Sequence, residues 1–246
     1  MLNIGEIIIM AVAVMRLSGT LFLVITAFFI CSGAIFAAPD TIPYGGSSAR
    51  EFRYTGENPL LVAVTKGDAD AVKSYLDKGI SANSRGENDA TPLTIAAYAG
   101  NKDIVKLLLE NDANPNQRDG NGSTALTIAA RYGYTDIAKL LVSHGIFVNI
   151  RDNKGNSALI IASMSGYTDI VKLILSRGAF IDSRGENDIT ALMAASEHGH
   201  LDTVKYLITR GARLNSERSD GKRALAIAVE NKHPEVAEAL KKAGAK

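Results

Sequence analysis

Apolar and polar positions along the chain recur with a fixed step of 33 residues. Leucine recurs at Leu60, Leu93, Leu126, Leu159, Leu192 and Leu225, and alanine at Ala63, Ala96, Ala129, Ala162, Ala195 and Ala228. Glycine keeps the step at Gly67, Gly100, Gly133, Gly166 and Gly199, with Lys232 in the sixth place. An amide or a carboxylate keeps it at Asn83, Asn116, Asn149, Asp182 and Asn215. Such periodicity predicts a stack of similar structural units.

Each unit reads as two short helices and a loop. In residues 91–116, Thr91 is a suitable N-cap, and Pro92 suits the first helical position, where its missing N–H costs nothing. Gly100 is expected to end this helix, because glycine adopts a positive φ without strain. The apolar pattern then predicts a second helix from Lys102 to Asn111 with one buried face.

Four segments carry nearly the same motif: TPLTIAAYAGNKDIVKLLL (91–109), TALTIAARYGYTDIAKLLVSHG (124–145), SALIIASMSGYTDIVKLILSRGA (157–179) and TALMAASEHGHLDTVKYLITRGA (190–212). This pattern resembles the ankyrin repeat over residues 58–246. The resemblance implies an all-α fold, an ankyrin-type α-solenoid of helix-turn-helix repeats with short β-hairpin-like finger loops. About six units are expected, at approximately 58–90, 91–123, 124–156, 157–189, 190–222 and 223–246.

An almost wholly apolar segment, residues 17–36, follows Arg16. With the small residues Ala37 and Ala38 behind it, this segment resembles a secretory signal peptide, and we expect cleavage after Ala37. An uncleaved membrane anchor is the alternative, because about 20 apolar residues are enough to span a bilayer. The predicted division of the chain is 1–37 for the signal peptide or anchor, 38–57 for a linker and 58–246 for the repeat array.

Composition and charge exclude several classes of function. Lys and Arg total 27 against 26 for Asp and Glu, so the chain lacks the basic field that nucleic-acid backbones require. The single cysteine, Cys31, lies in the N-terminal apolar segment, which leaves the array without a disulfide or a thiolate nucleophile. The four histidines form no known metal or catalytic motif, and no phosphate-binding or dinucleotide-binding loop is present. We therefore expect no enzymatic activity, no cofactor and no metal.

The resemblance implies that the array binds a protein along a concave strip of first helices. The exposed positions of this strip should be those just before each first-helix glycine: Tyr98, Arg131, Tyr132, Met164, Ser165, Glu197 and His198. Tyr, Arg and Met are enriched at protein interfaces, and Arg131 with Tyr132 is the strongest candidate pair. The alternative is that these are ordinary solvated positions that the repeat leaves free.

A second candidate surface is a ladder of four arginines on the fingers: Arg85, Arg118, Arg151 and Arg184. Stacked guanidinium groups would bind an acidic strip on a partner. Alternatively the arginines are structural, since carboxylates lie close to them in the sequence and the ankyrin pattern commonly has a basic residue here. We favour the structural interpretation.

These patterns predict a monomeric, non-enzymatic scaffold in the bacterial periplasm or envelope that binds a protein partner through the concave face and the fingers. Two alternatives differ in location. A secreted effector would bind host proteins that the producing cell lacks. A membrane-anchored adaptor would retain residues 17–36, which is the one condition under which the sequence predicts membrane contact.

Overall fold

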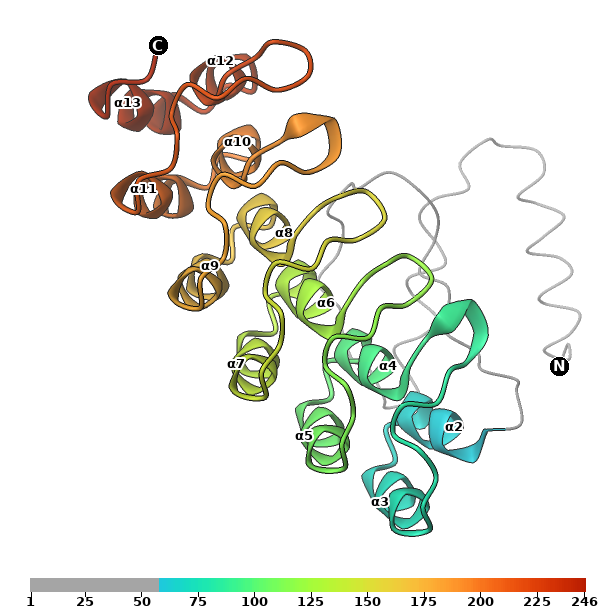
Figure 1. Cartoon of the computed structure of the whole chain (residues 1–246). Helices are drawn as coiled ribbons and strands as arrows, with labels where there is room; N and C mark the ends of the chain where they lie inside the picture. The colour runs from blue at the N-terminus through green and yellow to red at the C-terminus, as the bar shows by residue number, and fades with distance from the viewer. Residues whose placement is uncertain (1–57) are drawn as a thin grey trace, which may run out of the picture. The chain divides into compact units, whose positions relative to one another are not determined.

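The computed structural model describes residues 58–246, in which twelve α-helices form six pairs (Figure 1). The first helices of the pairs are α2 (Pro59–Lys66), α4 (Pro92–Tyr98), α6 (Ala125–Tyr132), α8 (Ala158–Met164), α10 (Ala191–Glu197) and α12 (Ala224–Glu230). The second helices are α3 (Ala69–Asp77), α5 (Lys102–Glu110), α7 (Thr135–Ser143), α9 (Thr168–Ser176), α11 (Leu201–Thr209) and α13 (Pro234–Lys242). The predictions for residues 1–37 and 38–57 lie outside the described residues.

The pairs stack in two rows, so that first helices pack on neighbouring first helices and second helices on second helices (Figure 1). Within residues 58–246 the structure contains no strand, and a single isolated bridge joins Arg151 to Ser157. Five finger loops connect the pairs, and each is closed by a backbone hydrogen bond between residues four positions apart: Gly86–Ala90, Asp119–Ser123, Asp152–Asn156, Gly185–Ile189 and Arg218–Lys222. The prediction of an all-α solenoid with hairpin-like fingers is confirmed.

Helix α4 begins at Pro92 and is capped by Thr91, as the sequence predicted. Thr91 caps α4 by accepting the backbone N–H of Thr94 at 3.1 Å, and Thr94 Oγ1 accepts the backbone N–H of Thr91 at 2.8 Å. This reciprocal capping box satisfies two N–H groups that a helix start leaves without partners. Thr190 caps α10 from one side only, because the residue three positions on is Met193, which has no hydroxyl group.

Four of the five glycines at the ends of the first helices, Gly100, Gly133, Gly166 and Gly199, meet two requirements at once. Gly133 has φ 75°, which disfavours residues with a Cβ. The ring of Tyr167 from the next unit also lies over Gly133, so that a Cβ would collide with it. At the last such position among the described residues Lys232 adopts φ 61°. The second helix α5 ends at Glu110, one residue before the predicted end.

The core is continuous along the stack. The alanines of the first helices, Ala96, Ala129, Ala162 and Ala195, are fully buried and small, which allows neighbouring helices to approach closely. The second helices bury one face only, as the apolar pattern predicted; in α5 this face is formed by Ile104, Val105 and Leu108. In the last described pair, α13 exposes Lys241 and Lys242.

The register of amides and carboxylates links each unit to the next. Asn149 Oδ1 accepts the backbone N–H of Phe180 at 2.9 Å, and Asn149 Nδ2 donates to the carbonyl of Gly178 at 3.3 Å. The same bond to the residue 31 positions further along the chain is made by Asn83, Asn116, Asp182 and Asn215. Because the donor is always a backbone N–H, this inter-unit bond does not depend on which side chain follows.

We expect Asn149→Ala to lower the free energy of unfolding by about 1–2 kcal/mol, since it removes two hydrogen bonds between units. Urea unfolding followed by circular dichroism measures the change. The control is Asn121→Ala, because the exposed Asn121 side chain makes no hydrogen bond among the described residues. Equal losses in the two variants would contradict the linking role of Asn149.

Two buried serines in the first helices, Ser163 and Ser196, allow the free-energy cost of a buried hydroxyl group without a hydrogen bond to be measured. Both are fully buried, but Ser196 Oγ donates to the carbonyl of Leu192 at 2.8 Å, whereas Ser163 Oγ has no partner among the described residues. We expect Ser163→Ala to raise the free energy of unfolding by about 1 kcal/mol relative to Ser196→Ala, since only the second change removes a hydrogen bond. Thermal or urea unfolding compares the two, and a larger gain from Ser196→Ala would refute the expectation.

Candidate protein-binding surface

In two neighbouring units the first helix ends at a side chain that contacts the finger of its own unit, 21 residues further on. The Tyr98 hydroxyl lies 3.3 Å from Asp119 Oδ2 and donates to it. Arg131 Nη2 lies 3.8 Å from Asp152 Oδ2. Both carboxylates are buried. Two of the predicted binding residues therefore also hold a finger against its helix.

The fifth unit makes the same contact with the charges exchanged. Glu197 Oε1 lies 3.2 Å from Arg218 Nη1, so the helix now supplies the anion and the finger the cation. Asp220 binds the same guanidinium at 2.7 Å, and the two carboxylates raise the pKa of Arg218. In the fourth unit the helix position is the half-buried Met164, whose side chain is apolar. The chemistry of this position therefore changes from unit to unit.

The buried finger carboxylates shape the loops around them. Asp119 accepts the backbone N–H groups of Asn121 and Ser123 at 2.9 and 2.8 Å, and Asp152 accepts the equivalent pair in the next finger. Burial raises the pKa of Asp119, while these two N–H donors and the Tyr98 hydroxyl act in the opposite direction. Asp119 is thus a structural group of the finger, inaccessible to a partner.

An aromatic cluster spans the second and third units. The Tyr98 and Tyr132 rings meet edge to face at 6.1 Å between centroids, and Tyr132 stacks on Tyr134 at 5.8 Å. Burial raises the pKa of Tyr98 to about 12, consistent with a hydroxyl enclosed between Tyr132 and Asp119. Tyr132 is the exposed member, with 40% of its surface in solvent. It is supported by two other rings, which limits the conformational entropy that it would lose on binding a partner.

The remaining predicted concave residues lie further along the same row of helix ends. Ser165 is half-buried and donates its hydroxyl to the carbonyl of Arg131 at 3.4 Å. His198 is exposed, and its ring lies parallel to that of His200 at 6.1 Å between centroids. Of the seven residues predicted for this surface, Tyr132 and His198 are exposed and the other five are half-buried.

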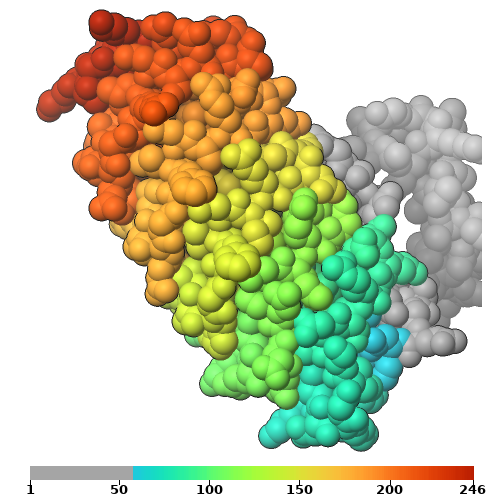
Figure 2. Space-filling model, viewed as in Figure 1, coloured from blue at the N-terminus to red at the C-terminus, as the bar shows by residue number. Residues whose placement is uncertain are grey.

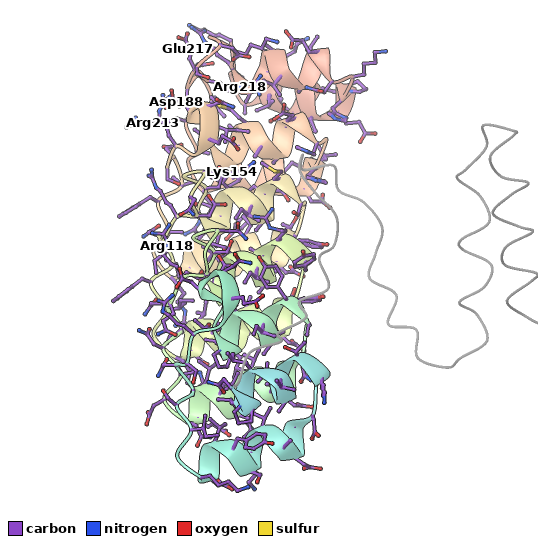
Figure 3. The ribbon with its side chains drawn as sticks, turned by 90° about the vertical axis from the view of Figure 1, so that its right-hand side faces the viewer. Arg118, Lys154, Asp188, Arg213, Glu217 and Arg218 are labelled. Carbon is purple, nitrogen blue, oxygen red and sulfur yellow. The ribbon has the colours of Figure 1, made fainter. Side chains whose placement is uncertain are left out.

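Three of the four arginines in the finger ladder connect one finger to the next. Arg85 and Arg184 each donate to a backbone carbonyl of the following finger, at 3.3 and 2.9 Å. Arg118, which lies on the loop side of the array in Figure 3, donates to the Asn153 side chain at 2.9 Å. Within residues 58–246 the Arg151 side chain makes no hydrogen bond or ion pair. Arg85 and Arg184 also pair with Asp89 and Asp188 at 3.2 and 3.6 Å.

Sequence reasoning identified the helix-end residues but missed their partners in the fingers. The signal was present in the differences between units, because the two contacting positions change together. They are Tyr and Asp in the second unit, Arg and Asp in the third, Met and Gly in the fourth, and Glu and Arg in the fifth. Paired changes at a constant spacing of 21 residues indicate contact within a unit.

The described residues offer no sign of metal chemistry or of a membrane span. Among residues 58–246 no group of three or more His, Cys, Asp or Glu side chains is placed to hold a metal ion. No helix of this range is long and apolar enough to cross a bilayer. The surface is therefore described by its hydrogen-bonding, charged and aromatic groups alone.

His200 predicts a dependence of stability on pH. Its Nε2–H donates to the carbonyl of Met164 at 2.9 Å, and burial lowers its pKa, with smaller effects from His198 and His233. A depressed folded-state pKa means that the unfolded chain takes up the proton first, at its usual value of about 6.5. Stability should therefore be full above that pH and be lost as the pH falls through the lower pKa of the folded state.

Urea unfolding at pH 7.5 and pH 5.5 tests this expectation. The control is His200→Tyr, because Tyr134 and Tyr167 occupy the same position in earlier units and lie over the equivalent glycines. The native chain should lose more stability between the two pH values than the variant does. Identical losses would show that His200 is not the group responsible.

Comparison with known proteins agrees with this geometry. A family model described as ankyrin repeats (3 copies) matches residues 40–119, 113–185 and 181–246. A comparison with curated proteins finds no match. The matched segments run without interruption from residue 40 to residue 246 and include every described helix. The chain belongs to the ankyrin-repeat family.

Proposed function

We propose that this chain is an exported scaffold of a bacterial envelope, located in the periplasm, that holds a protein partner on the row of first-helix ends. Ankyrin repeats generally mediate protein–protein interaction and are typically non-enzymatic. The binding surface runs from Tyr98 through Tyr132 and Arg131 to Glu197 and His198.

The observation that carries this proposal is that the Tyr132 side chain is exposed to solvent while two neighbouring rings hold it in place. An aromatic ring that is 40% exposed yet fixed by Tyr98 and Tyr134 is the kind of anchor on which protein interfaces concentrate their binding energy. Arg131 beside it is held by the carboxylate of Asp152. A partner would therefore meet a preorganised Tyr–Arg pair.

The location rests on the N-terminal sequence pattern. Residues 17–36 with Ala37 and Ala38 have the order of a signal peptide, and the array carries no cysteine that an oxidising compartment would cross-link. Export followed by cleavage leaves the repeat array in the periplasm. Retention of residues 17–36 would make the same array a membrane-anchored adaptor.

The test is affinity capture from an envelope extract of the producing cells, with the native chain and an Arg131→Gln, Tyr132→Ala double variant as baits. Glutamine at position 131 removes the charge without placing a second carboxylate beside Asp152. We expect the native chain to retain a partner, identified by mass spectrometry, that the variant retains at least tenfold less. Phe147→Asn, which removes an exposed aromatic residue elsewhere on the array, is the matched control and should retain the partner.

Each outcome bears on a different part of the proposal. Equal capture by native chain and double variant would rule out the Tyr132 surface. Capture only from a host lysate would replace the resident scaffold by a secreted effector. N-terminal sequencing of the mature chain decides between cleavage, which gives Ala38 as first residue, and a retained anchor.

A further inference from the structure

Two phenylalanines stand exposed at equivalent positions of neighbouring units. Phe147 and Phe180 are 70% and 67% exposed, more than any other large hydrophobic residue in the described range. They lie on the loops between a second helix and the following finger, and these loops cross the near face of the array in Figure 1. Figure 2 shows side chains of the yellow and orange bands that stand out from this face.

The hydrogen bonds that link the units fix both phenylalanines in one row. The backbone N–H of Phe147 donates to Asn116 at 2.6 Å, and that of Phe180 donates to Asn149 at 2.9 Å. Arg213 occupies the next place of the row and lies at the loop margin of the array in Figure 3. The same bond between units therefore holds the backbone at each place of the row, while the side chains of the row project into solvent.

The loops that carry the row are basic. Residues 144–151, 177–184 and 210–217 contain five arginines against Asp182 and Glu217, which gives a net charge of +3 where the whole chain has +1. Arg151, Arg177 and Arg210 are exposed, and in the described part of the chain their side chains make no ion pair or hydrogen bond. We name the surface formed by Phe147, Phe180, Arg151, Arg177 and Arg210 the Phe–Arg edge.

The exposed rings and the positive charge of the Phe–Arg edge indicate what kind of partner can bind it. A second copy of the chain would bring like charges together, which is unfavourable. Because both phenylalanine side chains are about two-thirds or more exposed, they stand out into solvent and do not enclose the side chains of an extended peptide. Protruding aromatic rings beside exposed guanidinium groups suit the surface of an anionic lipid bilayer. The rings can enter the bilayer while the guanidinium groups stay at the level of the lipid headgroups.

We infer that the Phe–Arg edge rests on the surface of an anionic phospholipid bilayer. The rings of Phe147 and Phe180 enter the headgroup–acyl boundary, and Arg177 and Arg210 lie against lipid phosphates. Two rings and a few charges give a weak, reversible contact.

The absence of tryptophan from the chain provides a direct test. Phe147→Trp and Phe180→Trp place a single fluorophore at the edge of the full-length chain, and Tyr132→Trp places one on the helix-end surface as the control. Each is mixed with phosphatidylcholine vesicles, with or without phosphatidylglycerol. We expect a blue shift, and quenching by brominated acyl chains, for the two edge variants with anionic vesicles only. The control reports whether mere proximity to the bilayer, for example through a retained N-terminal segment, is enough to shift the emission.

Adding Arg177→Gln and Arg210→Gln to Phe180→Trp should raise the anionic lipid concentration needed for half of the shift by roughly 30-fold. An unshifted edge fluorophore, an equal shift for Tyr132→Trp, or an equal shift with neutral vesicles would each overturn the inference. A shift with soluble poly-glutamate but none with vesicles would also overturn it, in favour of an acidic protein. Because Tyr132 lies outside the edge, failure here leaves the proposed partner surface untouched.

Discussion

The stack exists because no helix pair can bury its own apolar residues. Each pair is too short to enclose a core, so every unit depends on the unit beside it. At each junction the fully buried alanines of the first helices allow close approach, as Ala129 does in α6. At four of the five junctions a Tyr or His ring lies on the glycine of the preceding unit, and at the first junction the Asn101 side chain takes that place. At all five, an Asn or Asp side chain binds a backbone N–H of the following unit. These three local contacts set the register of the whole array without any long-range pairing.

Positions outside the junction are free to differ, and they give the surface its individual character. Along the helix ends the chemistry passes from Tyr98 in the second unit to Arg131 and Tyr132 in the third, then to Met164, and then to Glu197 with His198. Tyr98, Arg131 and Glu197 are each held by a residue in the finger of their own unit, so the contact is kept while its chemistry changes. A partner that matched this succession would bind in one register only, because no two units present the same side chains.

The repeat period predicted the features that depend on local backbone conformation. Thr91 and Pro92 mark the start of a helix and Gly100 marks its end, and both signals depend only on local backbone conformation. Asp112 takes the place that glycine has in other units and adopts φ 59°, because aspartate tolerates the left-handed region better than most residues. The period could not predict the use of Asn149 or Arg184, because both side chains bind backbone groups of another unit. The exposure of Phe147 was equally hidden, since an aromatic residue in a repeat is usually buried and the sequence does not reveal the direction of a loop side chain.

The contact between helix end and finger joins residues of one 33-residue unit, and the Asn or Asp contact between units uses a backbone N–H group that every residue except proline possesses. A segment that is copied or moved in the gene therefore carries its charge pairs with it and meets a compatible neighbour wherever it is inserted. The identical stretches at 84–89 and 183–188, three units apart and alike in their left-handed Asn–Asp turns, are what such copying would leave behind. The architecture thus lengthens or rearranges by recombination without redesign of its interior, and the exposed side chains alone have to adapt afterwards.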